Sequence, residues 1–317
     1  MLRALVIGAR RHRQGIGEFV ARYLDAAGVD VCGIVGTSAV SVDDAKETLA
    51  TRYAIDCNGY SNLDAALSVE NPDVVAICSP YPAHRKHLKA AAAAGCHCLC
   101  EKPLWWEQTP TPRSEETARL VDAFAQQNRH LALVTQWPCT LPEFYRLYPE
   151  VQDESVEEFT MHMGPTSRGR DMVLDAAPHP LSLLQELLGS GVVSQARAKY
   201  LHADQSDLCL DFSYIHASGT TRVGCRFTAT DEPPRPAAYV INGRRVDRWI
   251  QLPQYDLYLI GQDGTRAQEH KIKIRDPLET LVTEFVRNAA AGAPTDRQRL
   301  IESVVGLETL VNAVTES

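Results

Sequence analysis

Glu101-Lys102-Pro103 is a segment of this sequence whose residue types can do chemistry. It directly follows Cys96 to Cys100, an apolar run that is typical of a buried strand. An ammonium group there can hydrogen-bond a substrate hydroxyl and lower the barrier to its deprotonation. The motif alone is a weak signal, because surface lysines are abundant. Its position gives it weight, because ligands of open α/β sheets bind beyond the carboxyl ends of the strands.

Asp175 and His179 form a second pair of chemically capable side chains. Their spacing places them on one face of a helix, which we predict from Val173 to Leu188. A carboxylate can orient an imidazole and raise its basicity, which suits proton transfer near neutral pH. The alternative is an Asp that complements the helix dipole beside an incidental His. Pro178 restricts Ala177 toward extended conformations, so we expect the helix to begin near His179 and the shared face to be weakened.

The first strand-to-helix turn is rich in glycine and arginine. Ala4 to Ile7 predicts a buried parallel strand, and a helical pattern follows from Gly17 to Ala27. Glycines let the backbone approach a pyrophosphate at a helix N-terminus, as in the Gly-x-Gly-x-x-Gly fingerprint. This loop is longer and its second glycine is displaced, so a purely structural turn is the alternative. The loop residues expected to contact a dinucleotide are Gly8, Arg10, Arg11, Arg13, Gly15 and Ile16.

The second predicted strand, Val29 to Val35, carries no carboxylate at its end. An NAD enzyme usually places Asp or Glu there to bond the ribose 2′-hydroxyl, and that carboxylate would repel a 2′-phosphate. The hydroxyls of Thr37 and Ser38, with the guanidinium groups of the glycine loop, would accept a phosphate instead. We therefore expect NADP, with NAD as the alternative cofactor and a solvated arginine loop as the simpler explanation.

Ser79-Pro80-Tyr81-Pro82-Ala83-His84 follows the third buried strand, Val74 to Cys78, and His87 lies one helical turn further on. Both this segment and the Glu-Lys-Pro motif therefore lie at the edge of the sheet where ligands bind. The further expected cofactor contacts are Ser79, Pro80, His84, Glu101 and Lys102.

The order of these patterns predicts two domains. Strand and helix patterns alternate over residues 1–135, which predicts an α/β Rossmann domain with a doubly wound parallel sheet that binds NAD(P). Residues 136–317 carry mostly strand patterns separated by turn signals, which predicts an α+β domain with an open, mainly antiparallel sheet. We expect this second domain to bind substrate and to form oligomer contacts. Packing of its C-terminal helices, residues 277–315, on the first domain is left open.

Composition narrows the possible partners. The 317 residues carry a net charge of -8, which argues against nucleic acid and anionic membranes as partners. No stretch is apolar enough to span a bilayer, so we expect a cytoplasmic protein. The nine cysteines include Cys96, Cys98 and Cys100 on one strand face. Without a second ligand cluster we expect no metal and interpret them as small buried hydrophobes.

Taken together, these segments resemble the glucose-fructose oxidoreductase / inositol dehydrogenase / MocA (Gfo/Idh/MocA) family. Residues 99–104, Leu-Cys-Glu-Lys-Pro-Leu, are similar to its most characteristic motif, and residues 79–84 to its Ser/Thr-Pro-x-x-x-His segment. Asp175 and His179 resemble its Asp-x-Gly-x-His motif, although Ala177 replaces the glycine. Phe285, Gly292 and Pro294 resemble the family's C-terminal helix and the break that follows it.

The resemblance implies an activity and an assembly. Lys102 and His179 would flank a substrate hydroxyl or carbonyl as acid/base groups, with Asp175 beside them, and hydride would pass to or from the nicotinamide C4. Substrates would be sugars, cyclitols or related polar, and conceivably acidic, small molecules. The chain would form a homodimer or homotetramer through its C-terminal sheet.

The remaining expected substrate contacts have simpler alternatives. Trp106 and Trp137 could stack on a sugar ring or pack between domains, and Gln136-Trp137 stands where many family members carry Asn and Arg. Arg168 and Arg170 could bind a carboxylate or phosphate, or lie in an exposed loop. Two other functions stay open: an imine reductase of a biosynthetic pathway, and a cofactor-binding regulator or scaffold without turnover.

Overall fold

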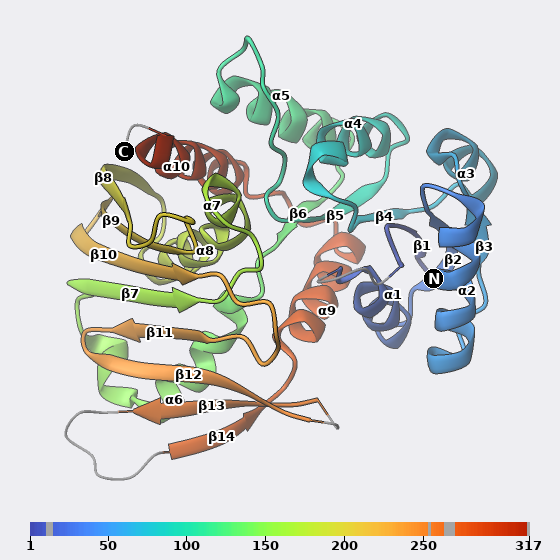
Figure 1. The fold of residues 1–317 in the computed structure, drawn as a ribbon. Coiled ribbons are helices and arrows are strands. Elements are labelled where there is room, and N and C mark those ends of the chain that lie inside the picture. The colour runs from blue at the N-terminus through green and yellow to red at the C-terminus, as the bar shows by residue number, and fades with distance from the viewer. Residues whose placement is uncertain (11–14, 253–254, 263–269, 316–317) are drawn as a thin grey trace. The chain divides into compact units, whose positions relative to one another are not determined.

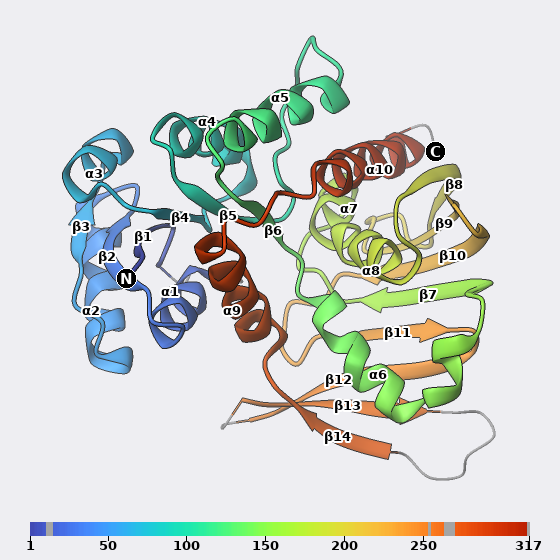
Figure 2. The ribbon, with the colours of Figure 1, turned by 180° about the vertical axis from the view of Figure 1, so that it is seen from behind.

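The computed structural model describes residues 1–10, 15–252, 255–262 and 270–315. The chain divides into two compact units, one formed by Met1–Val134 with Leu278–Ile301 and the other by Thr135–Pro277 with Glu302–Ser317. Figure 1 shows the elements of each unit in chain order, and Figure 2 shows them from behind.

The first unit is built on a six-stranded parallel sheet in the order β3-β2-β1-β4-β5-β6. Its strands are β1 (Arg3–Ile7), β2 (Asp30–Val35), β3 (Asn58–Tyr60), β4 (Val74–Ile77), β5 (His97–Glu101) and β6 (Leu131–Val134). The strand order reverses between β1 and β4, which is the topology that binds dinucleotides at the carboxyl ends of these strands. The predicted Rossmann fold is therefore confirmed.

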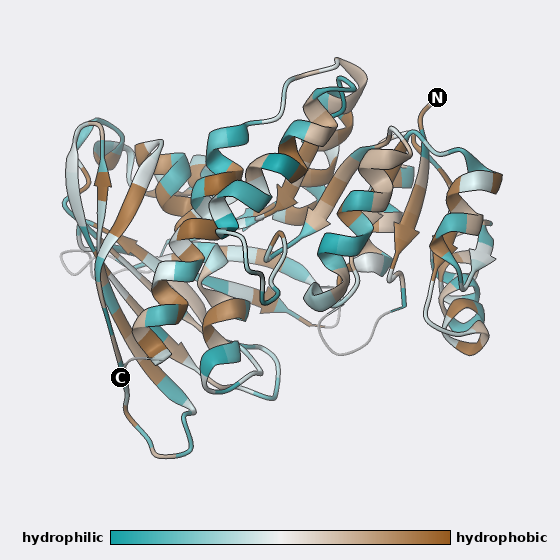
Figure 3. Cartoon of the chain, turned by 90° about the horizontal axis from the view of Figure 1, so that it is seen from above, coloured by the Kyte–Doolittle hydropathy of each residue, from teal (hydrophilic) through white to brown (hydrophobic). Residues whose placement is uncertain are grey.

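Helices connect these strands, as the alternating pattern predicts. They are α1 (Gly17–Ala26), α2 (Ala39–Tyr53), α3 (Leu63–Glu70), the 3₁₀ turn η1 (Tyr81–Ala83), α4 (His84–Ala93), α5 (Arg113–Ala125) and the later α9 (Pro277–Ala290). In Figure 3 the helices carry both hydrophobic and hydrophilic stretches, as expected for elements that bury one side against a sheet.

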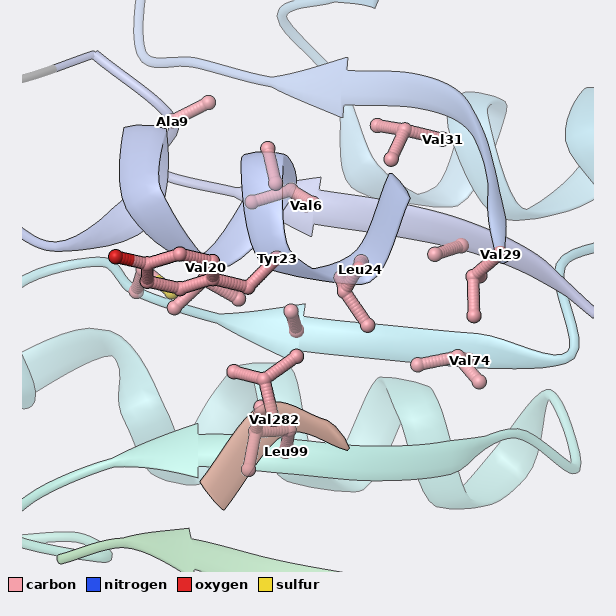
Figure 4. Packing of buried hydrophobic residues seen from close by; sticks show 14 of the residues in the cluster. Val6, Ala9, Val20, Tyr23, Leu24, Val29, Val31, Val74, Leu99 and Val282 are labelled. Carbon is pink, nitrogen blue, oxygen red and sulfur yellow. The ribbon is translucent and has the colours of Figure 1, made fainter. Parts of the chain in front are cut away.

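A continuous hydrophobic core joins this sheet to α1 and α9. Val6 of β1, Val74 of β4 and Leu99 of β5 are fully buried, and Leu24 of α1 and Val282 of α9 pack in the same cluster (Figure 4). Strands β1 and β4 are buried nearly throughout because helices cover both faces of a parallel sheet, so their sequences are almost continuously apolar.

The second unit is built on an eight-stranded sheet in the order β14-β13-β12-β11-β7-β10-β9-β8. Its strands are β7 (Glu158–Met163), β8 (Gly191–Tyr200), β9 (Asp207–His216), β10 (Gly219–Thr228), β11 (Ala237–Ile241), β12 (Arg244–Gln251), β13 (Asp256–Gln262) and β14 (His270–Ile274). Neighbouring strands are antiparallel except β7 and β10, which run parallel. The expected open, mainly antiparallel sheet is therefore confirmed.

Helices α6 (Leu141–Leu147), α7 (Arg170–Ala176) and α8 (Pro178–Leu188) lie on one face of this sheet in both Figure 1 and Figure 2. In β9 the side chains of Leu208, Leu210, Phe212 and Tyr214 are buried and alternate with more exposed ones, as expected for a sheet covered on one face. The chain is completed by η2 (Trp137–Thr140), η3 (Pro149–Asp153) and α10 (Arg297–Thr315). Among the described residues, no helix has the length and apolar character needed to cross a membrane.

A buried carboxylate fastens the edge of the first sheet. Glu70, at the end of α3, is only 3% exposed. Its carboxylate accepts hydrogen bonds from Asn58 Nδ2 at 2.7 Å and from the Tyr60 hydroxyl, and it pairs with Arg3 Nη2 at 2.8 Å. Burial alone would raise the pKa of this carboxyl, but the hydrogen bonds from Tyr60, Asn58 and Arg3 outweigh burial and lower the pKa. Glu70 thus joins β1, β3 and α3.

We predict that Glu70→Gln lowers the free energy of unfolding at pH 7 by about 1–3 kcal/mol, because a charge-assisted buried network loses its anion. The pKa of Glu70 is lower in the folded than in the unfolded protein, where it is about 4.3. The contribution is therefore present above about pH 4.3 and is lost as the pH falls through the folded-state pKa. Denaturant unfolding at pH 7 and at acidic pH measures this. Glu47→Gln, at an exposed site on α2, is the control, and equal losses in both variants would contradict the prediction.

Candidate active site

Two glycines fix the turn between β1 and α1. Gly8 has φ of 83°, and its amide donates to the Val35 carbonyl at 2.9 Å. A β-carbon at Gly8 would lie 2.7 Å from the Cys78 carbonyl oxygen, and one at Gly17 would lie 2.2 Å from the Gly8 carbonyl oxygen. Since real contacts of this kind are longer, both positions require glycine. The displaced glycine of the sequence pattern thus still allows α1 to approach β1 and β4 closely.

The N-terminus of α1 suits a phosphate group. Ile16 precedes the helix and contributes no side-chain cap to its first turn. Glu18, in that turn, is buried and accepts hydrogen bonds from Tyr53 and Arg52 near the end of α2, at 2.8 Å and 3.2 Å. Uncapped amides at a helix N-terminus bind phosphates, so this turn fits the pyrophosphate of a dinucleotide. Gly15 is partly buried beside it; the predicted contacts Arg11 and Arg13 lie outside the described residues.

The end of β2 presents hydroxyls and a guanidinium group. Thr37 and Ser38 are exposed. Ser38 caps α2, because its Oγ accepts from the Ser41 amide at 3.2 Å while Ser41 Oγ accepts from the Ser38 amide at 3.1 Å. Arg10 Nη2 lies 2.8 Å from Asp44 Oδ2, so this loop arginine reaches α2. The groups expected at a ribose 2′-position therefore lie around the N-terminal half of α2.

The segment after β4 is connected to the segment after β5 by a buried histidine. His84 is 1% exposed, and its Nε2 lies 2.6 Å from the Ser79 carbonyl oxygen while its Nδ1 lies 2.8 Å from the Pro103 carbonyl oxygen. Burial lowers the pKa of His84, whereas the Pro103 and Ser79 carbonyl groups act in the opposite direction, because they favour a ring that donates from both nitrogens. His87 Nδ1 lies 3.0 Å from Ser79 Oγ, and burial lowers its pKa to about 4.

Lys102 and Glu101 are partly buried at the carboxyl end of β5, and the Lys102–Pro103 peptide bond is cis. Pro80 is exposed at the end of β4, the strand between β1 and β5. The carboxyl ends of β1, β4 and β5 are adjacent in the sheet. The structure thus brings the glycine turn, the Ser-Pro segment and the Glu-Lys-Pro motif to one edge, as predicted from the order of strands.

The cysteines of β5 are packing residues. Burial raises the pKa of the Cys98 and Cys100 thiols well above their usual range, so both stay protonated. Within the described part of the chain, no group of three or more His, Cys, Asp or Glu residues could hold a metal ion.

Trp106 is 7% exposed, and the Arg113 guanidinium carbon lies 4.2 Å from the centroid of its ring. Its neighbour Trp105 is fully buried and donates from Nε1 to Thr117 Oγ1 at 3.0 Å. The Arg113 guanidinium therefore covers the Trp106 ring. The predicted stacking of a sugar on Trp106 needs an open ring face, which this arrangement does not offer.

In the second unit, Asp175 lies in α7 and His179 in α8, and both are partly buried. The expectation that Pro178 forces Ala177 into an extended conformation is wrong. Ala177 is helical, with φ -66° and ψ -25°, and its amide donates to the Val173 carbonyl at 2.9 Å. Proline at the first position of α8 requires no amide hydrogen bond, and the hydrogen bonds on both sides of Ala177 outweigh its local preference. The predicted single helix is therefore two consecutive helices, α7 and α8, separated only by Ala177, whose backbone angles are also helical.

Trp137 is the centre of the aromatic cluster around His179. It is 2% exposed, and its ring centroid lies 6.3 Å from that of His179 and 6.0 Å from that of Tyr239. The guanidinium carbon of Arg248 lies 5.5 Å from the Trp137 ring centroid. Sequence analysis missed Arg248, although Val246-x-Arg248-x-Ile250 is an alternating strand pattern with an arginine at an inward position.

The other predicted substrate contacts lie in less enclosed positions. Arg168 is exposed and forms a salt bridge with Asp204. Arg170 is exposed at the start of α7, and Gln136 is partly buried directly before η2. The structure therefore brings Trp137 to His179 but gives Arg168 a partner on the exposed surface instead.

Comparison with known proteins agrees with this fold. Residues 2–135 match the sequence model GFO_IDH_MocA, described as an oxidoreductase family with an NAD-binding Rossmann fold. An inositol 2-dehydrogenase of Corynebacterium glutamicum (strain R) is 26% identical over 189 residues, which are 57% of this chain and 54% of that protein. The match therefore spans about half the length of this curated relative.

Two solved structures are similar over nearly the whole chain. UDP-N-acetylglucosamine 3-dehydrogenase GnnA from Acidithiobacillus ferrooxidans has a TM-score of 0.72 and 20% identity, and the alignment covers 99% of this chain and 98% of that one. KijD10, a 3-ketoreductase from Actinomadura kijaniata in complex with NADP, has a TM-score of 0.75 and 14% identity, with 98% and 97% covered. At such identities the likeness shows the fold alone. The N-terminal match therefore relates residues 2–135 to the Gfo/Idh/MocA oxidoreductase family, and the solved structures show a similar fold over nearly the whole chain.

Proposed function

We propose that this protein is an NADP-dependent oxidoreductase that transfers hydride between the nicotinamide and a hydroxyl or carbonyl carbon of a sugar, cyclitol or related polar molecule. The observation that carries the proposal is Lys102 at the carboxyl end of β5, in the same sheet edge as the Gly8–Gly17 turn. The names of the relatives, inositol 2-dehydrogenase and UDP-N-acetylglucosamine 3-dehydrogenase, support this class of substrate.

The protein's own groups have distinct roles in this proposal. The bound cofactor supplies a hydride donor or acceptor, the nicotinamide C4. Gly8, Gly17 and the first turn of α1 hold its phosphates. Lys102 donates a hydrogen bond to the reacting oxygen of the substrate. His179 takes the proton of a hydroxyl or returns one to a carbonyl, and Asp175 orients its ring.

We also propose that the chain assembles as a homo-oligomer through the face of the eight-stranded sheet opposite to α6, α7 and α8. Trp249 and Tyr258 pair across β12 and β13 with their ring centroids 5.4 Å apart. Lys271 Nζ lies 3.5 Å and 4.0 Å from these centroids. A large, partly apolar sheet face of this kind favours association.

Lys102→Met and His179→Asn should each lower kcat for the preferred substrate by about 10²–10⁴-fold, because each removes a group that moves or stabilises the transferred proton. The binding of reduced cofactor, measured by its fluorescence, should change far less in His179→Asn. Steady-state rates followed by absorbance of the reduced cofactor measure the effect. Unchanged rates in both variants would refute the assignment of the acid/base pair.

Arg10→Ala should raise KM for NADPH by about 10-fold while KM for NADH changes less than threefold, because only NADPH offers a 2′-phosphate for a charge-assisted hydrogen bond. Asp44→Asn is the matched variant. It frees Arg10 from its ion pair and should lower KM for NADPH. Equal changes for both cofactors, or a wild-type preference for NADH, would contradict the proposed cofactor.

His84→Ala should lower kcat by about 10-fold or more and change the cofactor KM little, because His84 holds the turn that positions Lys102. His87→Ala is the matched control, since it contacts Ser79 but neither carbonyl bound by His84. Denaturant unfolding of both variants shows whether they remain folded. A loss of equal size in the control would mean that His84 has no special positioning role.

A further inference from the structure

Arg248 occupies an unusual position for a charged residue. It lies in β12, two residues after fully buried Val246 and opposite fully buried Leu259 of β13. Because side chains alternate along a strand, Arg248 projects from the same face as these two residues, the face on which α6, α7 and α8 lie. A guanidinium group is therefore placed on the inner, apolar side of the sheet.

The protein offers this cation little compensation. Arg248 Nε is inaccessible to solvent and has no hydrogen-bond partner among the described residues. The contact with the Trp137 ring, at 5.5 Å from the centroid, is a cation–π interaction and neutralises no charge. Burial lowers the pKa of Arg248, and Arg235 acts in the same direction, while Tyr255 and Asp276 oppose it. Arginine nevertheless remains protonated in proteins, so this partly buried side chain keeps its charge while its Nε has no partner.

The free-energy cost of an unpaired charge such as Arg248 is retained in a protein where a bound ligand offsets it. Buried charges in proteins are normally paired, and an unpaired one is strongly destabilising. An anion bound to the Arg248 guanidinium would offset its desolvation and give Nε a partner. The planar guanidinium is suited to bind a carboxylate or phosphate through two parallel hydrogen bonds.

Trp137 contacts both Arg248 and the candidate acid/base residue His179. The Trp137 ring meets the His179 ring in a T-shaped arrangement and has the Arg248 guanidinium over it, and both contacts lie within the second unit. Trp137 is itself buried and also packs on Tyr239. Arg248 and His179 therefore both lie against the same buried ring.

We propose that Arg248 forms a subsite for an oxyanion of the substrate, a carboxylate or a phosphate, and that Trp137 sets its distance from His179. This inference rests on the proposed function and narrows its substrate class to acidic sugars, cyclitols or their phosphates. It also replaces Arg168, whose guanidinium is paired with Asp204 on the surface, as the expected anion-binding residue.

The test compares glucose, glucuronate and glucose 6-phosphate, which share a sugar ring and differ in charge. Without cofactor, we expect one of the two anions to raise the Tm of the wild-type protein, while glucose at the same concentration does not. Arg248→Met should abolish this shift, and Arg168→Met, the matched surface control, should keep it. Glucuronate as the stabilising anion would identify a carboxylate subsite, and glucose 6-phosphate a phosphate subsite.

The kinetic arm uses the same three compounds with NADP. In the wild type, kcat/KM should be higher for the stabilising anion than for glucose. Arg248→Met should lower kcat/KM for that anion by about 10–100-fold, the size expected for one charge-assisted interaction, and change kcat/KM for glucose less than threefold. Arg248→Lys keeps the positive charge but cannot form two parallel hydrogen bonds. It should recover part of the lost kcat/KM for the anion. It also replaces Arg248→Met in the test if that variant fails to fold.

Some outcomes overturn the proposal. No wild-type stabilisation by either anion over glucose, or an equal loss of kcat/KM for all three compounds in Arg248→Met, would show that Arg248 has no anion subsite. Turnover of glucose alone would leave the proposed oxidoreductase function intact and refute the subsite. An Arg248-dependent Tm shift without turnover of any of the three compounds would support the subsite and count against the proposed oxidoreductase function.

Discussion

The first unit depends on the close packing of the Gly17 backbone against the carbonyl group of Gly8. A β-carbon at Gly17 would overlap that carbonyl, at 2.2 Å, so the start of α1 lies directly against the end of β1. Gly8 is equally confined by the carbonyl of Cys78 at the end of β4. These two contacts fix where the amide groups of α1 meet the sheet edge. Every other group at that edge, from Ser79 to Lys102, takes its position relative to them through the strand register.

The charged and polar groups near this edge mostly have protein partners. Glu18 is bonded to Tyr53 and Arg52, and the two ring nitrogens of His84 meet two carbonyl groups. Glu70, away from the motifs, binds three residues from two strands. Since buried polar groups in folded proteins are normally satisfied, these pairings serve stability and positioning. Arg248 Nε departs from this rule, as Arg129 Nε and Trp137 Nε1 do. Of the two arginines, Arg248 is the one that lies against Trp137 in the second unit.

The sequence predicts the first unit better than the second for a physical reason. Strands β1, β4 and β5 are buried on both faces, so each reads as an apolar run with turn residues at its end. The short strand β3 is not predicted in this way, because its three residues Asn58–Tyr60 do not form an apolar run. Strands β12 and β14 are not predicted either. Charged residues such as Asp247 and Lys271 lie on their outer faces and make the alternation of apolar and polar residues hard to recognise.

The residues of the candidate site likewise fall into those that the sequence predicts and those that it does not. Motifs that follow buried strands, around Gly8, Ser79 and Lys102, were found because both the strand and its end are visible in sequence. Arg248 was not found, because its significance comes from the inward direction of one side chain in a strand that was itself missed. The conformation of Ala177 could not be predicted either, since tertiary and helical hydrogen bonds outweigh the restriction that Pro178 imposes locally.

Trp137 shows why the geometry of the second unit matters for specificity. From sequence it could be a stacking platform for a sugar or a packing residue. With 2% exposure and with His179, Tyr239 and Arg248 against it, the ring has no free face for a substrate. Its effect on a ligand is therefore indirect, through the separation that it imposes between an imidazole and a guanidinium group. A rigid aromatic spacer of this kind selects substrates by the distance between their reacting carbon and their anionic group, and a substrate with the right groups at the wrong distance would bind without reacting.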